Sequence, residues 1–316
     1  MGAWALSKLQ RLARSVRAFY RGFSRVTPAG GVASPTTQPT IGVALGGGFA
    51  RGLAHIGVLK VLEAEHIPIH LVAGTSVGAV IGAAYCSGMS PKEMEEIAAL
   101  VRFKDFARWT LSRYGLATND RMAHFLQRIL KVRTFAELRV PLAVAATDFV
   151  SGEGVVFRSG PLVDPVRASC AYPGMFLPVN VNGRLLVDGL LAHAVPTRPL
   201  REMGAARVVA VNLAAHWVQE GGGGPRHIFD VIGQCFSIAQ QQMCQFWQAA
   251  ADVILEPDVR GFGYDEFERA AALIRAGEAA ARQALPVIRT WLGGPSPVAR
   301  SPLPAAAPAP LQVSGG

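Results

Sequence analysis

The chain has 316 residues, half of them hydrophobic and only 17% charged, which is the composition of a folded protein with a sizeable core. Its four cysteines show no C-x-x-C spacing, so neither a zinc site nor a disulfide framework is expected, and a reducing compartment is favoured. The net charge of +9 is concentrated in residues 1–40, which hold six of the 31 basic side chains and no acidic one. The rest of the chain is nearly neutral, which argues against nucleic-acid binding.

Residues 1–26 are predicted to form a basic amphipathic helix. On a helical wheel one side is apolar and the other carries the six cations, namely Lys8, Arg11, Arg14, Arg17, Arg21 and Arg25. This pattern favours a helix that lies in the plane of an anionic membrane surface. Two alternatives stay open, a helix packed on the protein body and a targeting segment.

Residues 27–40 contain several prolines and glycines without apolar periodicity and are predicted to be a linker. Residues 292–316 are rich in proline and alanine and are predicted to be a disordered tail. Between them, residues 41–291 are expected to form one compact domain. The uncharged stretch 71–91 is interpreted as a buried strand and helix, so no membrane span is expected.

Strand and helix patterns alternate through this domain, which implies an α/β fold with a mostly parallel sheet and helices on both faces. The expected strands are 41–45, 69–73, 142–147, 154–158, 184–187, 207–212 and 253–256, and the expected helices are 52–65, 77–86, 91–101, 226–250 and 265–290. The helix 226–250 is interpreted as part of the core, with a lipid groove as the alternative. Residues 102–131 mix aromatic and basic side chains, which suits either a lid facing a membrane or a helical subdomain with a buried aromatic face.

A glycine-rich segment, Gly46–Gly52, lies between the first predicted strand and helix. It does not fit a dinucleotide-binding fingerprint, because Arg51 stands where the third glycine belongs, nor a P-loop, because Leu53 stands where lysine belongs. Exposed backbone N–H groups at a helix N-terminus suit an oxyanion hole. The alternative is a tight turn that only permits close packing.

The second motif is Gly74-Thr75-Ser76-Val77-Gly78, directly after one predicted strand and before the next helix. In this context flanking glycines relieve crowding at a sharp turn that exposes a serine hydroxyl, as in a nucleophile elbow. The alternative is a serine that only caps a helix. The glycine-rich segment one strand–helix unit upstream favours the nucleophile, since neighbouring parallel strands would bring both motifs together.

A reactive serine needs a base, and two kinds are possible. A triad would recruit His193, His216 or His227. Alternatively an aspartate acts directly, and Asp188 follows the predicted strand 184–187 and precedes a glycine; burial would have to tune its pKa. Asp148 and Asp164 are further candidates.

These blocks, in this order, resemble the patatin-like phospholipases, lipid acyl hydrolases that use a Ser–Asp dyad. The resemblance covers about residues 41–290 and includes Ala168-Ser169 followed by Pro173. It implies a three-layer α/β/α patatin-like fold, Ser76 as nucleophile, Asp188 as proton acceptor and no metal or cofactor. It further implies an oxyanion hole at Gly46, Gly47 and Gly48, loop support from Arg51, and motif support from Gly74, Gly78 and Gly189. The chain departs from the family pattern at Leu190 and at His193-Ala194.

The expected function is hydrolysis of fatty-acyl esters of phospholipids or related lipids, by a cytoplasmic enzyme that binds anionic membranes peripherally through residues 1–26. Two alternatives remain open. One is a soluble carboxylesterase or thioesterase with a histidine-completed triad, and the other is a non-catalytic membrane adaptor that keeps the fold. No nucleic-acid partner is expected.

Overall fold

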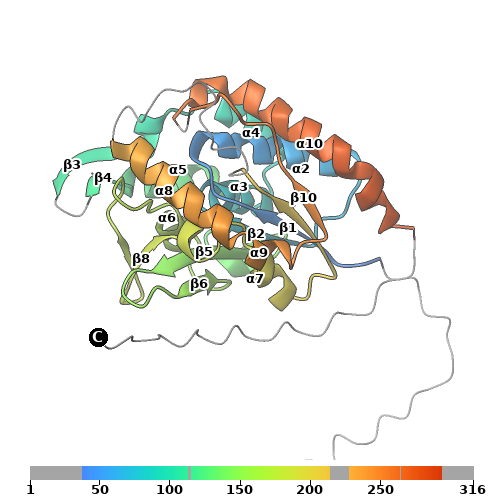
Figure 1. Cartoon of the computed structure of the whole chain (residues 1–316), viewed down its shortest axis with the longest axis horizontal. Coiled ribbons are helices and arrows are strands. Elements are labelled where there is room, and N and C mark those ends of the chain that lie inside the picture. The colour runs from blue at the N-terminus through green and yellow to red at the C-terminus, as the bar shows by residue number, and fades with distance from the viewer. Residues whose placement is uncertain (1–37, 113–114, 214–227, 264, 294–316) are drawn as a thin grey trace, which may run out of the picture. The chain divides into compact units, whose positions relative to one another are not determined.

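The computed structural model describes residues 38–112, 115–213, 228–263 and 265–293. These residues form a mixed α/β domain around a central sheet in the order β10-β9-β1-β2-β5-β8-β7, with β6 paired to β5 (Figure 1). The predicted basic helix 1–26, most of the linker 27–40 and nearly all of the tail 292–316 lie outside the described residues. Those three assignments therefore stay predictions.

Five strands run parallel, and they are β1 (Ile41–Leu45), β2 (Leu71–Thr75), β5 (Leu142–Asp148), β9 (Arg207–Val211) and β10 (Val253–Leu255). Every residue of β1, β2 and β5 is buried. Such short continuous apolar runs are typical of parallel strands covered by helices on both faces. The prediction of a mostly parallel sheet is confirmed.

The other edge of the sheet is antiparallel. Strands β6 (Gly154–Phe157) and β8 (Arg184–Asp188) both pair with β5, and β7 (Val179–Val181) pairs with β8. The register places Asp188, the last residue of β8, opposite Ala146 of β5. A separate two-stranded antiparallel sheet consists of β3 (Arg108–Ser112) and β4 (Gly115–Thr118), within the segment for which the sequence suggested a lid or a helical subdomain.

Helices cover both faces of the parallel strands. On one face lie α2 (Ala54–Ala64), α3 (Val77–Cys86), α4 (Pro91–Ala98), α5 (Asp120–Ile129) and α10 (Ala270–Thr290). On the other lie α7 (Thr197–Glu202) and α9 (Gln245–Gln248). The remaining described helices are α6 (Val163–Ser169), α8 (Ile228–Met243) and the 3-10 turns η1 (Phe49–Leu53), η2 (Phe103–Asp105), η3 (Phe135–Glu137), η4 (Gly189–Leu191) and η5 (Phe267–Arg269).

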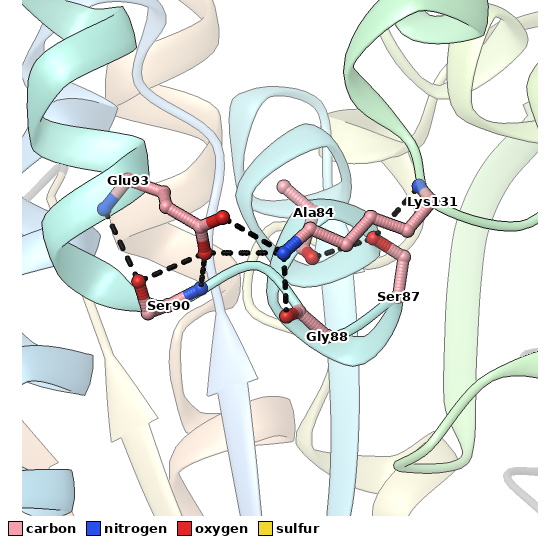
Figure 2. Close-up of polar contacts among 6 residues, drawn as sticks. All are labelled: Ala84, Ser87, Gly88, Ser90, Glu93 and Lys131. Carbon is pink, nitrogen blue, oxygen red and sulfur yellow. Dashed lines mark hydrogen bonds and ion pairs between the residues drawn. The ribbon is translucent and has the colours of Figure 1, made fainter.

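Helix α4 begins with a capping box. The Glu93 N–H donates to Ser90 Oγ at 3.2 Å, and Glu93 Oε2 accepts from the Ser90 N–H at 2.7 Å. Lys131, just after α5, reaches the same carboxylate at 2.8 Å and the Gly88 carbonyl at 3.1 Å (Figure 2). One polar cluster therefore joins the ends of three helices, α3, α4 and α5.

The interpretation of residues 226–250 as a core helix is wrong. Helix α8 ends at Met243, α9 follows, and large apolar side chains along the two are exposed, namely Val231, Ile238, Met243 and Phe246. Helical spacing identified an apolar stripe but not what that stripe faces. No helix among the described residues is both long and apolar enough to span a membrane.

Candidate active site

Ser76 occupies a strained turn between β2 and α3. Its φ of 56° and ψ of −127° are rarely adopted by L-residues, and such a backbone costs about 1–3 kcal/mol unless its surroundings enforce it. The surroundings are tight: a Cβ on Gly78 would lie 2.2 Å from the Leu45 carbonyl oxygen, and one on Gly74 would lie 2.4 Å from the Gly78 carbonyl oxygen. The turn thus has the geometry of a nucleophile elbow.

Two hydroxyl groups fix this elbow from neighbouring elements. The Ser76 N–H donates to Ser169 Oγ at 2.8 Å, and the Ser169 hydroxyl donates to the Ala145 carbonyl of β5 at 2.6 Å. The Thr75 hydroxyl donates to the His193 carbonyl at 2.6 Å, which ties the elbow to the segment after β8. Sequence reasoning placed Ser169 only in a family block and gave Thr75 no role.

Asp188 is fully buried beside Ser76. Its Oδ1 accepts the Leu190 N–H at 2.9 Å, and Oδ2 makes no hydrogen bond of ordinary geometry within the described part of the chain. Burial raises the pKa of Asp188 to about 7, against the opposing pull of the Ser76 hydroxyl and the Leu190 N–H. Leu190, a departure from the family pattern, therefore contributes its backbone to the site.

Gly189 allows β5 to approach this carboxylate closely, since a Cβ there would lie 2.4 Å from the Ala145 carbonyl oxygen. The Thr147 hydroxyl of β5 donates to the Asp188 carbonyl at 2.9 Å. The backbone at Asp188 and Gly189 is thus anchored on β5, and this fixes the position from which the carboxylate projects.

The glycine loop lies next to the elbow, because a Cβ on Gly47 would lie 3.5 Å from Ser76 Cβ. The Gly46 N–H donates to the Val211 carbonyl at 3.1 Å, and the Gly47 N–H donates to the Ala194 carbonyl at 3.3 Å. Among the described residues the Gly48 N–H has no such partner. The Gly46 N–H is thus engaged by the sheet, which leaves the Gly48 N–H, and the Gly47 N–H with its longer bond, as the candidate oxyanion donors.

The side chains of His55 and Arg51 make hydrogen bonds at the glycine loop. His55 Nε2 lies 2.8 Å from the Gly46 carbonyl oxygen, and since a carbonyl can only accept, this nitrogen carries the proton. Burial lowers the pKa of His55 to about 4, so the ring is neutral at ordinary pH. Arg51 Nε donates to the Phe262 carbonyl at 2.9 Å. The sequence motifs gave no indication of this role for His55.

The alternative bases lie elsewhere. His193 is turned toward β6, because a Cβ on Gly154 would lie 2.3 Å from His193 Nε2. Asp148 accepts from Arg184 Nε and from two turn N–H groups, and these hydrogen bonds lower its pKa to about 2. Asp164 pairs with Arg167. His216 and His227 lie outside the described residues.

A strained serine elbow beside a buried carboxylate and a glycine loop, on a mostly parallel sheet, is typical of serine hydrolases of the α/β class. Within that class the chain belongs to the patatin-like phospholipase family, whose family model, described as "Patatin-like phospholipase", matches residues 43–201. The matched range includes the glycine loop, the elbow, Ser169 and Asp188.

Curated relatives agree with this family. An uncharacterized NTE family protein of Mycobacterium tuberculosis is 32% identical over 193 residues, 56% of this chain and 50% of the relative. Patatin-like phospholipase domain-containing protein 6 of Homo sapiens is 31% identical over 222 residues, 66% of this chain and 16% of the relative. The chain thus spans about half the length of the mycobacterial relative and a small part of the human one.

Solved structures of similar shape include VipD from Legionella pneumophila, with a TM-score of 0.46 and 13% identity over 79% of this chain and 67% of that chain. The ExoU–SpcU complex from Pseudomonas aeruginosa gives a TM-score of 0.43 and 16% identity over 82% of this chain and 53% of that chain.

Proposed function

We propose that this chain is a serine acyl hydrolase that cleaves fatty-acyl esters of phospholipids or related lipids with Ser76 and Asp188 as its catalytic pair. Membership of the patatin-like phospholipase family supports hydrolysis of lipid esters. The observation that carries the assignment of residues is the buried Asp188 beside the strained Ser76 elbow, with its pKa raised to about 7. A base with a pKa near the working pH removes a hydroxyl proton far better than an ordinary carboxylate.

In the acylation step Asp188 accepts the Ser76 proton on Oδ2, while Ser76 Oγ attacks the ester carbonyl carbon. The Leu190 N–H keeps Oδ1 in place during this transfer. The negative charge on the carbonyl oxygen is stabilised by the Gly48 N–H and by the Gly47 N–H, whose long bond to Ala194 is exchanged for the oxyanion. The tetrahedral intermediate then expels the alcohol, which takes the proton from Asp188.

In the deacylation step Asp188 accepts a proton from water as that water attacks the acyl-serine carbonyl. Collapse of the second tetrahedral intermediate releases the fatty acid, and the proton returns to Ser76 Oγ. The two steps together consume one water molecule and yield one alcohol and one fatty acid, with Ser76 and Asp188 restored.

Labelling with a fluorophosphonate probe, together with fatty-acid release from lysophosphatidylcholine and phospholipid vesicles, tests the proposal. Wild-type protein should be labelled and active, while Ser76→Ala and Asp188→Asn should lose both properties. Activity that survives in Asp188→Asn but is lost in His193→Ala would favour the histidine triad instead. A folded protein that is neither labelled nor active would favour a non-catalytic adaptor.

The sequence also supports peripheral binding to anionic membranes through the six cations of residues 1–26. Co-sedimentation with vesicles that contain phosphatidylserine tests this role on the full chain. Replacing all six with glutamine should release the protein from these vesicles but not change its hydrolysis of a soluble ester. Equal binding by both proteins would contradict the proposal.

A further inference from the structure

An apolar cavity begins at Ser76 and follows helix α3. The α3 residues that line it are Val77, Val80, Ile81 and Ala84, which have the i, i+3, i+4, i+7 spacing of one helix face. Ala84 comes eight positions after Ser76, so at 1.5 Å per residue this wall is about 12 Å long. The α3 wall of the cavity therefore runs about 12 Å from the elbow at Ser76.

The opposite walls come from two other helices. Helix α4 contributes Met94, Ile97 and Ala98, and α5 contributes Met122, Phe125 and Ile129. Among the described residues that line the cavity, none is charged and Ser76 alone carries a hydroxyl. The space amounts to about 840 Å³ when the open space at its mouth is included.

Ordinary protein cores do not leave such a space between apolar helix faces, because interiors are close-packed. Here the three helices are tied together at their ends by polar contacts. The Lys131 ammonium bonds Glu93 of α4 and the Gly88 carbonyl after α3, and the Lys131 N–H donates to Ser87 Oγ at 3.4 Å (Figure 2). Ser87 in turn donates to the carbonyl of Ala84, a lining residue. These contacts fix the helices around the cavity.

A second pocket of about 740 Å³ meets the first at Ser76. It is more polar, since its lining includes Gly47, Gly48, Tyr172, Ser237 and Gln240. Within the part of the chain that the structure describes, Ser76 and Phe49 are the residues that line both spaces. Phe49 has a positive φ of 51°, and its ring packs edge-on against Tyr172 with centroids 4.9 Å apart. Phe49 thus separates an apolar space from a polar one at the hydroxyl of Ser76.

From this geometry we infer that this cavity, the acyl channel, binds the acyl chain of the substrate and that its α3 wall, which includes Ala84, limits the chain length. The leaving alcohol, with its head group, then occupies the pocket that contains Gln240. The inference rests on the proposed function for the reaction at Ser76. It adds a selectivity for acyl chains of limited length.

The chain-length profile of the wild-type protein is the first test. With p-nitrophenyl esters from acetate to palmitate, kept below their micelle concentrations, kcat/KM should rise with each added methylene by up to about fourfold. The rise should stop once the chain fills the channel. A profile that does not depend on chain length would overturn the inference while leaving the proposed function intact.

A variant that shortens the channel is the second test. Ala84→Leu should lower the ratio of kcat/KM for dodecanoate to that for butyrate by at least about tenfold, since a misfit of one or two carbon atoms has effects of this order. The matched control is Ala99→Leu, at an exposed position beside α4, which should leave the ratio unchanged. Ala98→Leu, from the α4 wall, provides a second variant if Ala84→Leu does not fold. Unchanged ratios in a folded lining variant would overturn the inference.

Binding of cis-parinaric acid, a fatty acid that fluoresces in apolar surroundings, distinguishes the two proposals. If the wild-type protein hydrolyses no ester, the proposed function fails. The acyl channel still stands in that case if wild-type protein binds parinaric acid and Ala84→Leu weakens this binding at least about tenfold while Ala99→Leu does not. Absence of binding to the wild type, or equal binding by all three proteins, overturns the channel.

Discussion

The backbone N–H of Ser76 is bound by the side chain of Ser169, which lies 93 positions later in the chain and is itself anchored on β5 through the Ala145 carbonyl. A single hydroxyl therefore both accepts from the elbow and donates to the sheet. This arrangement fixes the strained backbone of Ser76 relative to strand β5.

Removing this hydroxyl should slow the reaction more than it weakens substrate binding. In Ser169→Ala the Ser76 N–H loses its acceptor, so the elbow relaxes and Oγ leaves its position beside Asp188. We expect kcat for a soluble ester to fall at least about tenfold with little change in KM, together with a loss of about 1–3 kcal/mol of stability. Steady-state kinetics and denaturant unfolding measure both effects.

Thr197→Val is the matched control for this change. The Thr197 hydroxyl is also buried and also donates to a backbone carbonyl, that of Trp247 at 2.7 Å, but it lies on α7. It should lose comparable stability and keep kcat. A similar fall in kcat for both variants would show that general loosening, and not the contact with Ser76, lowers the rate.

The raised pKa of Asp188 predicts the pH dependence of activity. Only the deprotonated carboxylate can accept the Ser76 proton, so kcat/KM should fall on the acid side with an apparent pKa near 7. His55 does not produce this acid limb, because its own pKa is lowered to about 4. An acid limb near 4 in the kcat/KM profile of a soluble ester would contradict the assignment of Asp188.

The same pKa shift predicts that Asp188 destabilises the fold at neutral and alkaline pH. Its pKa rises from 3.8 unfolded to about 7 folded, so the folded state binds more protons between these values and stability is lost as pH rises through 7. The loss is on the order of 4 kcal/mol. Asp188→Asn should therefore be more stable than wild type at pH 8 and nearly equal to it below pH 4, by denaturant unfolding.

Asp148→Asn serves as the control, because it should change the stability of the fold in the opposite direction. Hydrogen bonds from Arg184 and two turn N–H groups lower the pKa of Asp148 to about 2. Its stabilisation is present above the unfolded value of 3.8 and is lost as pH falls through 2. This variant should be less stable than wild type at pH 8. Equal effects of the two substitutions would refute the electrostatic explanation.

The sequence predicted the parallel half of the fold better than the antiparallel half. The expected strand 41–45 and helix 77–86 have the observed bounds, because continuous apolar runs and glycine-marked turns are local signals. Strands β3, β4 and β7 were not expected, since short strands with mixed polarity have no distinctive periodicity. They pair with their neighbours in the chain, β3 with β4 and β7 with β8, so the missed feature is local hairpin pairing.

The candidate active site likewise has residues that the sequence predicted and residues that it did not. Ser76 and Asp188 could be proposed from motifs that place a polar residue at a strand end. The role of His55 could not, because it depends on the glycine loop folding back so that the Gly46 carbonyl meets the ring. The hydrogen bond from the Gly46 N–H to the Val211 carbonyl could not be predicted from the sequence either, because it follows from the pairing of β1 with β9.

His55 should act as a positioning residue for the glycine loop. In His55→Leu the Gly46 carbonyl loses its buried donor, which costs about 1–3 kcal/mol and lets the Gly48 N–H drift. We expect kcat to fall at least about tenfold, and His55→Gln, which can still donate to Gly46, to recover part of it. His70→Leu removes a histidine that accepts from the Ile41 N–H at the start of β1 and should leave kcat unchanged. No recovery with glutamine would argue for a purely structural role.

Two glycines of α3 should respond very differently to the same substitution. A Cβ at Gly78 would lie 2.2 Å from the backbone oxygen of Leu45, whereas one at Gly82 would first meet the Val72 side chain at 3.1 Å. Backbone of a central strand cannot yield, so Gly78→Ala should displace the start of α3, abolish activity and cost at least about 2 kcal/mol. Gly82→Ala needs only a small shift of a side chain, and alanine favours the helix by about 1 kcal/mol, so its stability should stay within about 1 kcal/mol of wild type. Thermal and denaturant unfolding of the two variants test this, and equal losses would mean that the elbow does not depend on the close approach of α3 to β1.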